Sequence, residues 1–149
     1  MSEEKKKQES FEIRRIYIKD ASFEAPNTPN IFHIDWKPDI QFNLNTNIKK
    51  IEKNIFEVIL KIRLIVKIEN DLVFLCDIDQ AGIFFIKNLS EKRLKHCLYS
   101  YCPNILFPYA RACISSFISY GSFPQINLAP INFDALYYNH LKLEKKVSK

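Results

Sequence analysis

The feature that most constrains the fold is a long alternation of apolar and polar side chains between residues 56 and 68. Every even-numbered position of this segment is apolar, while Glu57, Lys61, Arg63 and Lys67 occupy odd positions. A period of two that lasts this long is typical of a β-strand, because successive side chains of a strand point to opposite faces of its sheet. We therefore expect a long strand with one apolar face.

Another strand is expected over residues 10–24, where the apolar positions change parity between Ile13 and Ile16. A slip of one position moves the apolar side chains to the other face of a strand. This strand should therefore either bulge near Arg14 and Arg15 or be apolar on different faces at its two ends.

Two shorter strands flank the long one in sequence. Residues 39–45 alternate as a half-buried or edge strand does, and residues 72–79 follow a tight turn at Asn70-Asp71. Because short loops join antiparallel neighbours, the pattern predicts an antiparallel sheet of about four strands. Residues 25–38 contain three prolines, which cannot continue a ladder, and so predict a crossover loop.

After Asn88 the apolar period becomes that of helices. We predict helices at residues 90–101, at 106–120 and from 133 onward. Ser90 is a candidate N-cap, the Cys102-Pro103 step should end the first helix, and Gly121 should end the second. Strands followed by helices indicate an α+β domain in which a four-stranded antiparallel sheet has helices packed on one face.

Length and composition are those of one globular domain, with 149 residues of which 47% are hydrophobic. We expect a single domain over 1–149, with flexible tails at 1–9 and 142–149. No apolar stretch follows the charged N-terminus, and charges interrupt every apolar run well before a membrane-spanning length. These features predict a cytoplasmic protein without direct membrane insertion, whose four cysteines are mostly buried free thiols.

The net charge of +5 has two interpretations. Much of the excess lies in the lysine-rich last eight residues, which leaves the body close to neutral. The alternative is a sheet that binds single-stranded nucleic acid, because Phe11, Arg14, Arg15 and Tyr17 interleave aromatic and basic side chains. We favour the first interpretation and expect no nucleic-acid partner.

Motifs for catalysis are weak. The chain has two glycines, which argues against a phosphate-binding loop, and no cofactor site is expected. The spacing of His96, Cys97 and Cys102 matches no common zinc pattern, so a thiol or metal enzyme is a minor alternative. Asp77 and Asp79 share one strand face and are best interpreted as an exposed acidic patch.

Apolar residues remain on the sheet face that the helices would leave bare. They are Ile59, Ile65, Val73 and Leu75. Such an excess usually indicates an oligomer or a binding groove.

Several idiosyncratic strings resemble the SecB family of bacterial protein-export chaperones. They are RIYIKDASFEAPN at 15–27, DWKP at 35–38, FLCDIDQAGIF at 74–84, HCL at 96–98, YCPNILFPYAR at 101–111 and FPQINLAPINFDALY at 123–137. The resemblance runs nearly end to end. It implies an ATP-independent chaperone, not an enzyme, that keeps unfolded secretory precursors translocation-competent, delivers them to the SecA motor ATPase and assembles as a homotetramer, a dimer of dimers.

The resemblance also assigns roles to residues. Asp20, Glu24, Leu75 and Asp77 match the SecA-contacting surface of the family. Well-known relatives are net acidic, whereas this chain is net basic. We therefore expect SecA binding to depend more on the local carboxylates, with Asp79 beside the matching positions.

Two further residue sets follow from the resemblance. The implied client groove comprises Trp36, Ile40, Phe42 and Leu44, although Trp36 could instead be a core residue. The implied oligomer-interface positions are Cys76, Ile78, Gln80 and Cys97. For the first three of these, simple core packing explains the apolar parity equally well.

Overall fold

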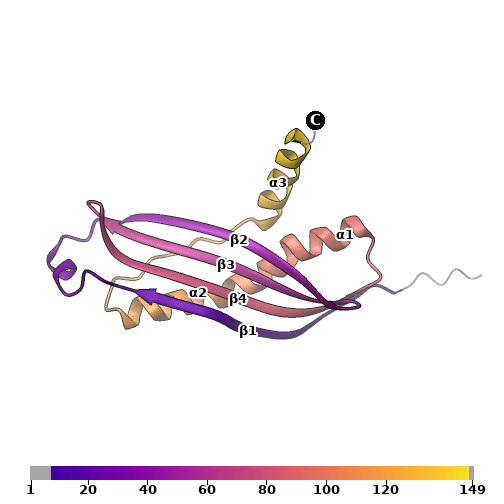
Figure 1. Ribbon diagram of the computed structural model, residues 1–149, viewed down its shortest axis with the longest axis horizontal. Helices are drawn as coiled ribbons and strands as arrows, with labels where there is room; N and C mark the ends of the chain where they lie inside the picture. Colours follow the sequence, from indigo (N-terminus) through magenta and orange to yellow (C-terminus); the bar gives the residue numbers. More distant parts are fainter. Residues whose placement is uncertain (1–7, 148–149) are drawn as a thin grey trace, which may run out of the picture.

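The computed structural model describes residues 8–147 (Figure 1). The elements in chain order are β1 (Ser10–Glu24), a 3-10 turn η1 (Asn30–His33), β2 (Asp39–Glu52), β3 (Ile55–Ile68), β4 (Asp71–Lys87), α1 (Glu91–His96), a π-helical turn η2 (Cys97–Tyr101), α2 (Cys102–Tyr120) and α3 (Phe133–Val147). Strands come first and helices afterwards, which confirms the α+β class.

The four strands form one antiparallel sheet in the order β1-β4-β3-β2. The predicted four-stranded antiparallel sheet is therefore confirmed. Strands β3 and β4 lie in the middle, and β1 and β2 are the two edges. The long crossover loop between β1 and β2 spans the width of the sheet, since it joins its opposite edges.

The alternation in β3 has the predicted effect. Its even-numbered side chains, including Val58, Leu60 and Leu64, are fully buried, whereas Arg63 and Lys67 on the other parity are exposed. Pairing with β4 keeps the two parities in phase, because Leu64 lies opposite Cys76 and Arg63 lies opposite Asp77. The even face of both central strands therefore forms the core, and the odd face remains open.

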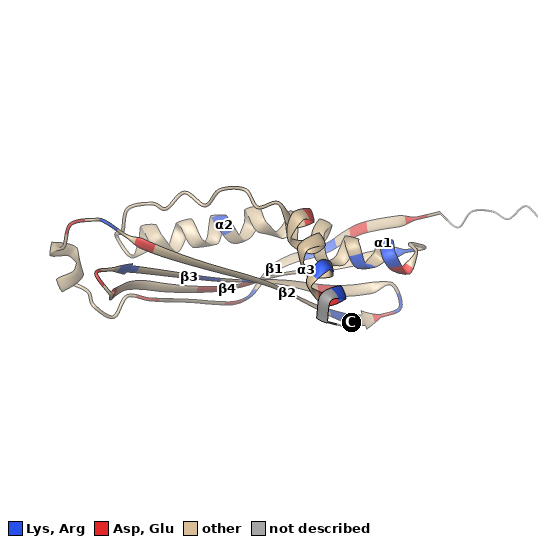
Figure 2. Cartoon of the chain, turned by 90° about the horizontal axis from the view of Figure 1, so that it is seen from above, with Lys and Arg blue, Asp and Glu red and all other residues tan. Residues whose placement is uncertain are grey.

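Helices cover only one face of the sheet (Figure 2), and burial of the even-numbered side chains of β3 and β4 identifies it as the even face. Helix α2 runs along this face with a buried stripe of Leu106, Ala110, Ile114 and Ile118. The expected single helical layer is confirmed, and the opposite face of the sheet is not covered by any helix of the described chain. Among residues 8–147, no helix is both long and apolar enough to cross a membrane.

Two strand ends and one turn differ from the sequence expectation. β2 continues to Glu52 and β4 to Lys87, because both follow β3 over its full length. The turn between β3 and β4 is centred on Glu69 and Asn70, both with positive φ, and Asp71 already pairs with Ile68. A two-residue turn with positive φ at both positions matches the twist of a hairpin, which explains the shift of one residue.

The bulge expected in β1 is present. The register with β4 slips between Ile13 and Arg15, and a second slip follows between Ile18 and Asp20. Each slip restores the apolar side chains to the helical side after a change of parity. In β4 an extra residue, Val73, disturbs the pairing with β3 and is buried, so it does not join the bare apolar surface that we expected.

The predicted helix end at Cys102-Pro103 is wrong. Cys102 has φ −65° and ψ −48°, and α1, η2 and α2 follow one another with helical backbone at each junction. The Cys102 N–H donates to the carbonyl of Cys97, five residues back, so the helix widens for one turn just before Pro103. Pro103 then enters the first turn of α2, where a missing N–H is tolerated.

Helix α3 begins at Phe133, as predicted, and projects from the body beside β2 (Figure 1). It continues to Val147, so residues 142–147 are helical where we expected a tail to begin. Residues 8 and 9 of the expected N-terminal tail are exposed and precede β1 without regular secondary structure, and residues 1–7 and 148–149 lie outside the described residues.

Candidate binding surfaces

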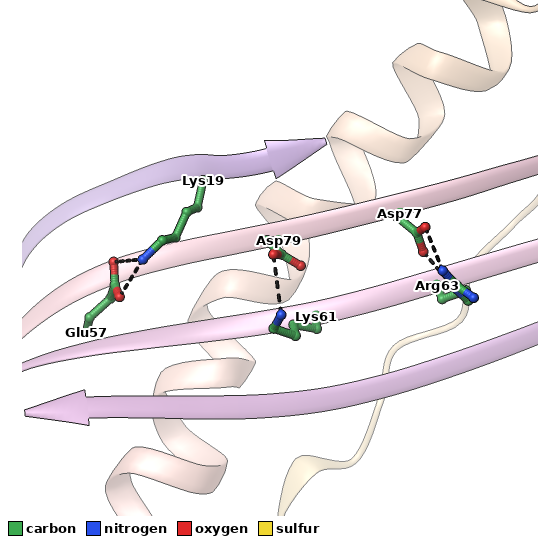
Figure 3. Close-up of polar contacts among 6 residues, drawn as sticks. All are labelled: Lys19, Glu57, Lys61, Arg63, Asp77 and Asp79. Atoms are coloured by element: carbon green, nitrogen blue, oxygen red, sulfur yellow. Dashed lines mark hydrogen bonds and ion pairs between the residues drawn. The ribbon is translucent and has the colours of Figure 1, made fainter. Parts of the chain in front are cut away.

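A charged band crosses the middle of the open sheet face (Figure 3). Asp77 Oδ1 and Oδ2 accept hydrogen bonds from Arg63 at 2.8 and 3.0 Å, and Asp79 lies 3.6 Å from Lys61 Nζ. The antiparallel register places each pair directly opposite one another. The hydrogen bonds from Arg63 to Asp77 raise the pKa of that guanidinium. The acidic patch expected at Asp77 and Asp79 is therefore balanced by two cations of β3.

The four residues implied to contact SecA lie on this same face. Glu24 pairs with Leu75 in the β1–β4 register, and Ser22 and Asp20 follow opposite Asp77 and Asp79. Neither Asp20 nor Glu24 forms an ion pair within 4 Å in the described chain, although the charge of Glu24 helps to raise the pKa of Arg63. A shallow hollow of about 370 Å³ adjoins Asp20, Asp77 and Asp79. The surface thus combines unpaired carboxylates on β1 with a half-buried leucine on β4.

A second polar cluster on the open face was not predicted. Glu57 is only 7% exposed, and it accepts hydrogen bonds from the Tyr17 hydroxyl and from Lys19 Nζ at 2.9 and 3.1 Å. Burial, together with the hydrogen bond to Glu57, raises the pKa of Tyr17 to about 12. The Tyr17 hydrogen bond and the Lys19 charge lower the pKa of Glu57. No local sequence pattern predicts this cluster, because its residues come from β1 and β3, which are far apart in the sequence.

The client-groove residues lie along β2 and the loop before it. Ile40 and Phe42 form one wall of a hollow of about 200 Å³, and the connection between α2 and α3 forms the other. That second wall comprises Ile126, Asn127, Leu128, Ala129 and Ile131. Leu44 lines a neighbouring hollow of about 410 Å³ with Tyr99 and residues of α3. The sequence analysis predicted the wall formed by β2 but not the wall formed by the connection between α2 and α3, although the string FPQINLAPIN contains the apolar residues of that second wall.

Trp36 lies at one end of this region in a cluster of aromatic rings. Its ring stacks on Phe123 with centroids 6.4 Å apart, and Phe32 approaches the same ring at 5.3 Å. Phe123 in turn contacts Phe74 of β4 at 5.3 Å. Trp36 is half-buried, so it belongs partly to the core and partly to the surface.

The implied interface residues occupy two different places. Cys76, Ile78 and Gln80 of β4 are buried under the helices of their own chain. Gln80 donates from Nε2 to the Tyr17 carbonyl at 3.0 Å. Cys97 lies on the π-helical turn η2 and lines a separate pocket. The structure does not bring these four residues together on one surface.

The residues of the nucleic-acid alternative do not form a joint surface either. Phe11 packs against Phe84 and Tyr101 on the helical side, whereas Tyr17 binds Glu57 on the open side. The Arg14 guanidinium stacks over the ring of Phe85. Within residues 8–147, no group of three His, Cys, Asp or Glu side chains is placed to hold a metal ion.

Comparisons with known proteins agree with the strings found in the sequence. Residues 4–144 match a family model described as Preprotein translocase subunit SecB. A protein-export protein SecB of Buchnera aphidicola subsp. Acyrthosiphon pisum (strain Tuc7) is 77% identical over 142 residues, which cover 95% of this chain and all of the relative. Its counterpart from subsp. Schizaphis graminum (strain Sg) is 67% identical and covers 97% of this chain and 94% of the relative.

A solved structure shares the fold. It is a SecB-like chaperone of Mycobacterium tuberculosis, determined in complex with a ChAD peptide from an antitoxin. The TM-score is 0.68 at 15% sequence identity, over 81% of this chain and 90% of that one.

Proposed function

The chain belongs to the SecB family, and on this premise we propose that it is a protein-export chaperone that binds unfolded precursors and delivers them to the SecA motor. The chain acts as a binding protein in the cytoplasm, before translocation, and uses no nucleotide of its own. Release of a precursor follows from competition for many weak contacts, which are spread over more than one hollow.

The observation that carries this proposal is the apolar region along β2. Two hollows lie one after the other beside this edge strand, and the stacked rings of Trp36 and Phe123 belong to the segments that precede Ile40 and Ile126 in the chain. Unfolded precursors expose aliphatic and aromatic segments that a folded protein hides, and burial of such segments is favourable without sequence recognition. Ile40, exposed to 43%, is well placed to contact them.

The open sheet face is the proposed SecA contact. Asp20 and Glu24 supply negative charge and form no ion pair among the described residues. Leu75 lies opposite Glu24, two residues along β4 from Asp77 of the Arg63–Asp77 pair. A basic partner segment would gain from the β1 carboxylates and would bury Leu75. Because this face is opposite the helical side, a precursor and SecA have separate surfaces on one protomer.

We also propose that protomers assemble through β1, as a first step towards a dimer of dimers. β1 is an edge strand, and its Ile13 and Ile18 are 44% and 43% exposed. An apolar edge strand is a template for pairing with another chain, and two identical antiparallel edges satisfy a two-fold axis.

The proposed function is tested by refolding a denatured secretory precursor with and without stoichiometric protein, in the absence of nucleotide. We expect slower refolding and less light scattering. Ile40→Ser should weaken both effects, whereas Ile51→Ser, at a similarly exposed position of β2 outside the hollows, should not. Refolding and scattering that stay unchanged with the wild-type tetramer would refute the chaperone function.

The SecA contact is tested by neutralising its unpaired carboxylates. The double variant Asp20→Asn, Glu24→Gln should weaken SecA binding by about tenfold at low salt, in line with two exposed charge contacts. The matched double variant Glu52→Gln, Asp71→Asn removes the same charge from the ends of other strands and should bind normally. Equal affinities of both double variants, measured by calorimetry across a salt series, would exclude the β1 carboxylates from the contact.

A further inference from the structure

The π-helical turn brings two cysteines together. In a regular α-helix, residues five apart point about 140° away from one another around the axis. In η2 the Cys102 N–H donates to the Cys97 carbonyl, so these two residues lie at the two ends of one wide turn. Their side chains meet there, and the Cys102 thiol donates a hydrogen bond to Cys97 Sγ.

The surroundings of the two thiols differ. Cys102 is fully buried, whereas Cys97 is 9% exposed and lines a solvent-open pocket of about 640 Å³. Lys92, Arg93 and His96 line the same pocket, where Arg93 forms an ion pair with Glu9, and His96 contacts Asp134. The hydrogen bond from Cys102, and then the charge of Arg93, lower the pKa of Cys97, while its own donated bond and burial raise the pKa of Cys102.

We propose that Cys97 and Cys102 form a redox-sensitive dithiol that hydrogen peroxide oxidises to a disulfide within the helix. Cys97 is the attacking thiol, because it reaches the pocket and has the basic side chains of Lys92 and Arg93 near it. Cys102 is the resolving thiol, because it already contacts Cys97 and has no access of its own to solvent.

The reaction has two balanced steps. The Cys97 thiolate attacks one peroxide oxygen, the O–O bond breaks, and the departing hydroxide takes up a proton to leave as water. The Cys102 sulfur then attacks the sulfenic sulfur of Cys97, the S–S bond forms, and the hydroxyl group leaves with the Cys102 proton as a second water. Peroxide is the oxidant, and the two thiols together lose two electrons and two protons.

The other two cysteines provide an internal comparison. Cys76 is buried in β4, and burial raises its pKa to about 12. Cys113 is half-buried on α2, and burial raises its pKa as well. Neither lines the pocket of Cys97, so both should oxidise more slowly.

Peptide mapping of the full chain tests the proposal directly. Trypsin releases residues 96–111 as one peptide that contains Cys97 and Cys102 but no other cysteine. After brief treatment with peroxide and alkylation, this peptide should lose the mass of two hydrogen atoms and resist alkylation. The peptides with Cys76 and Cys113 should remain alkylated. Oxidation of those two cysteines first, or disulfides between chains in place of the internal one, would overturn the proposal.

A variant separates the two roles. In Cys102→Ala, the sulfenic acid of Cys97 should persist and react with dimedone. Loss of the hydrogen bond from Cys102 should also raise the pKa of Cys97, and alkylation of Cys97 should slow by about tenfold for each unit of that rise. Cys113→Ala is the matched control and should oxidise as the wild type does. An unchanged alkylation rate in Cys102→Ala would show that Cys102 does not activate Cys97. The wild-type mapping keeps the test valid even if a variant folds poorly.

Discussion

Glu57 is the one charged side chain of β3 that is buried on the open face. Its odd position predicts exposure, as found for Arg63. The difference comes from β1, which sends Tyr17 and Lys19 over β4 to meet the carboxylate. Ala81 lies between Tyr17 and β3 in the register, and its small side chain leaves space for the ring. One carboxylate thereby links β3 to β1 across the intervening strand β4.

This arrangement predicts a stability change in alkaline solution. The pKa of Tyr17 is raised from 10.0 to about 12, so the folded state favours the neutral phenol. The contribution of this pKa shift to the free energy of unfolding is complete below pH 10. It is lost as the pH rises towards about 12, because in that range Tyr17 ionises readily only in the unfolded chain. Tyr17→Phe should cost about 1 kcal/mol at neutral pH and should flatten the alkaline loss of stability.

Urea unfolding between pH 7 and about 11 measures both effects. Tyr120→Phe is the control, since Tyr120 is 82% exposed and should contribute little at any pH. A Tyr17→Phe protein that loses stability with pH as steeply as the wild type would show that the alkaline transition has another origin.

Sequence patterns predict which side chains of β3 are apolar, but they do not predict this cluster. The alternation is local, and burial of its even positions follows from one apolar face. The contact between Glu57 and Tyr17 depends on the sheet order β1-β4-β3, which no short segment encodes. For the same reason, the cations that balance Asp77 and Asp79 become visible only once the register is known.

At the junction of η2 and α2, core packing outweighs the local preference of a residue that precedes proline. Residues before proline disfavour helical geometry, yet Cys102 is helical and fully buried. Leu98 and Leu106 on either side of the step are buried in the same core, so a break at Cys102-Pro103 would expose apolar surface. The wide π-helical turn keeps both leucines buried. The local preference of a residue before proline does not take account of such a turn.

Gly121 is the C-cap of α2, and contact rather than backbone strain favours glycine at this position. Its φ is −78°, which any residue adopts, but a Cβ there would lie 2.8 Å from Phe23 and 2.9 Å from Phe123. Gly121→Ala should therefore destabilise the protein by about 1–3 kcal/mol through overpacking. It should also weaken precursor binding, because Phe123 supports Trp36. Urea unfolding and the refolding assay measure the two effects.

The sign of the stability change in Gly121→Ala distinguishes overpacking from the usual effect of replacing glycine. Without the two rings, replacing glycine by alanine at a compatible φ stabilises a protein by about 0.4–1 kcal/mol. Ser116→Ala, at an exposed position of the same helix, should change stability little and serves as the control. A more stable Gly121→Ala protein would mean that Phe23 and Phe123 move aside easily.

The whole molecule has two chemically different faces because one sheet is covered on one side only (Figure 2). The helical side holds the apolar hollows along β2, and the open side holds the charged band. The apolar excess in the sequence indicated a groove or an oligomer, and the class α+β followed from the element order. Which apolar residues stay exposed depends on which strands become edges, and the pairing order that decides this is not local.

The two edges differ in a way that predicts how protomers meet. β1 presents Ile13 and Ile18, whereas the two exposed isoleucines of β2 are Ile40, which lines the apolar hollow, and Ile51, which follows two lysines. Lysine on an edge opposes pairing, so β1 is the better candidate for self-association. At a two-fold axis, each substitution enters the interface twice, which amplifies its effect.

Ile13→Lys should therefore shift the protein towards smaller species at a concentration where the wild type is assembled. The dissociation constant should rise by about tenfold or more, because like charges would face each other across the paired edges. Ile51→Lys adds the same charge at a site of similar exposure, 46%, and should leave assembly unchanged. Sedimentation velocity over a dilution series compares the two. Equal sedimentation of both variants would place the interface away from β1, and loss of assembly in Ile51→Lys alone would place it on β2.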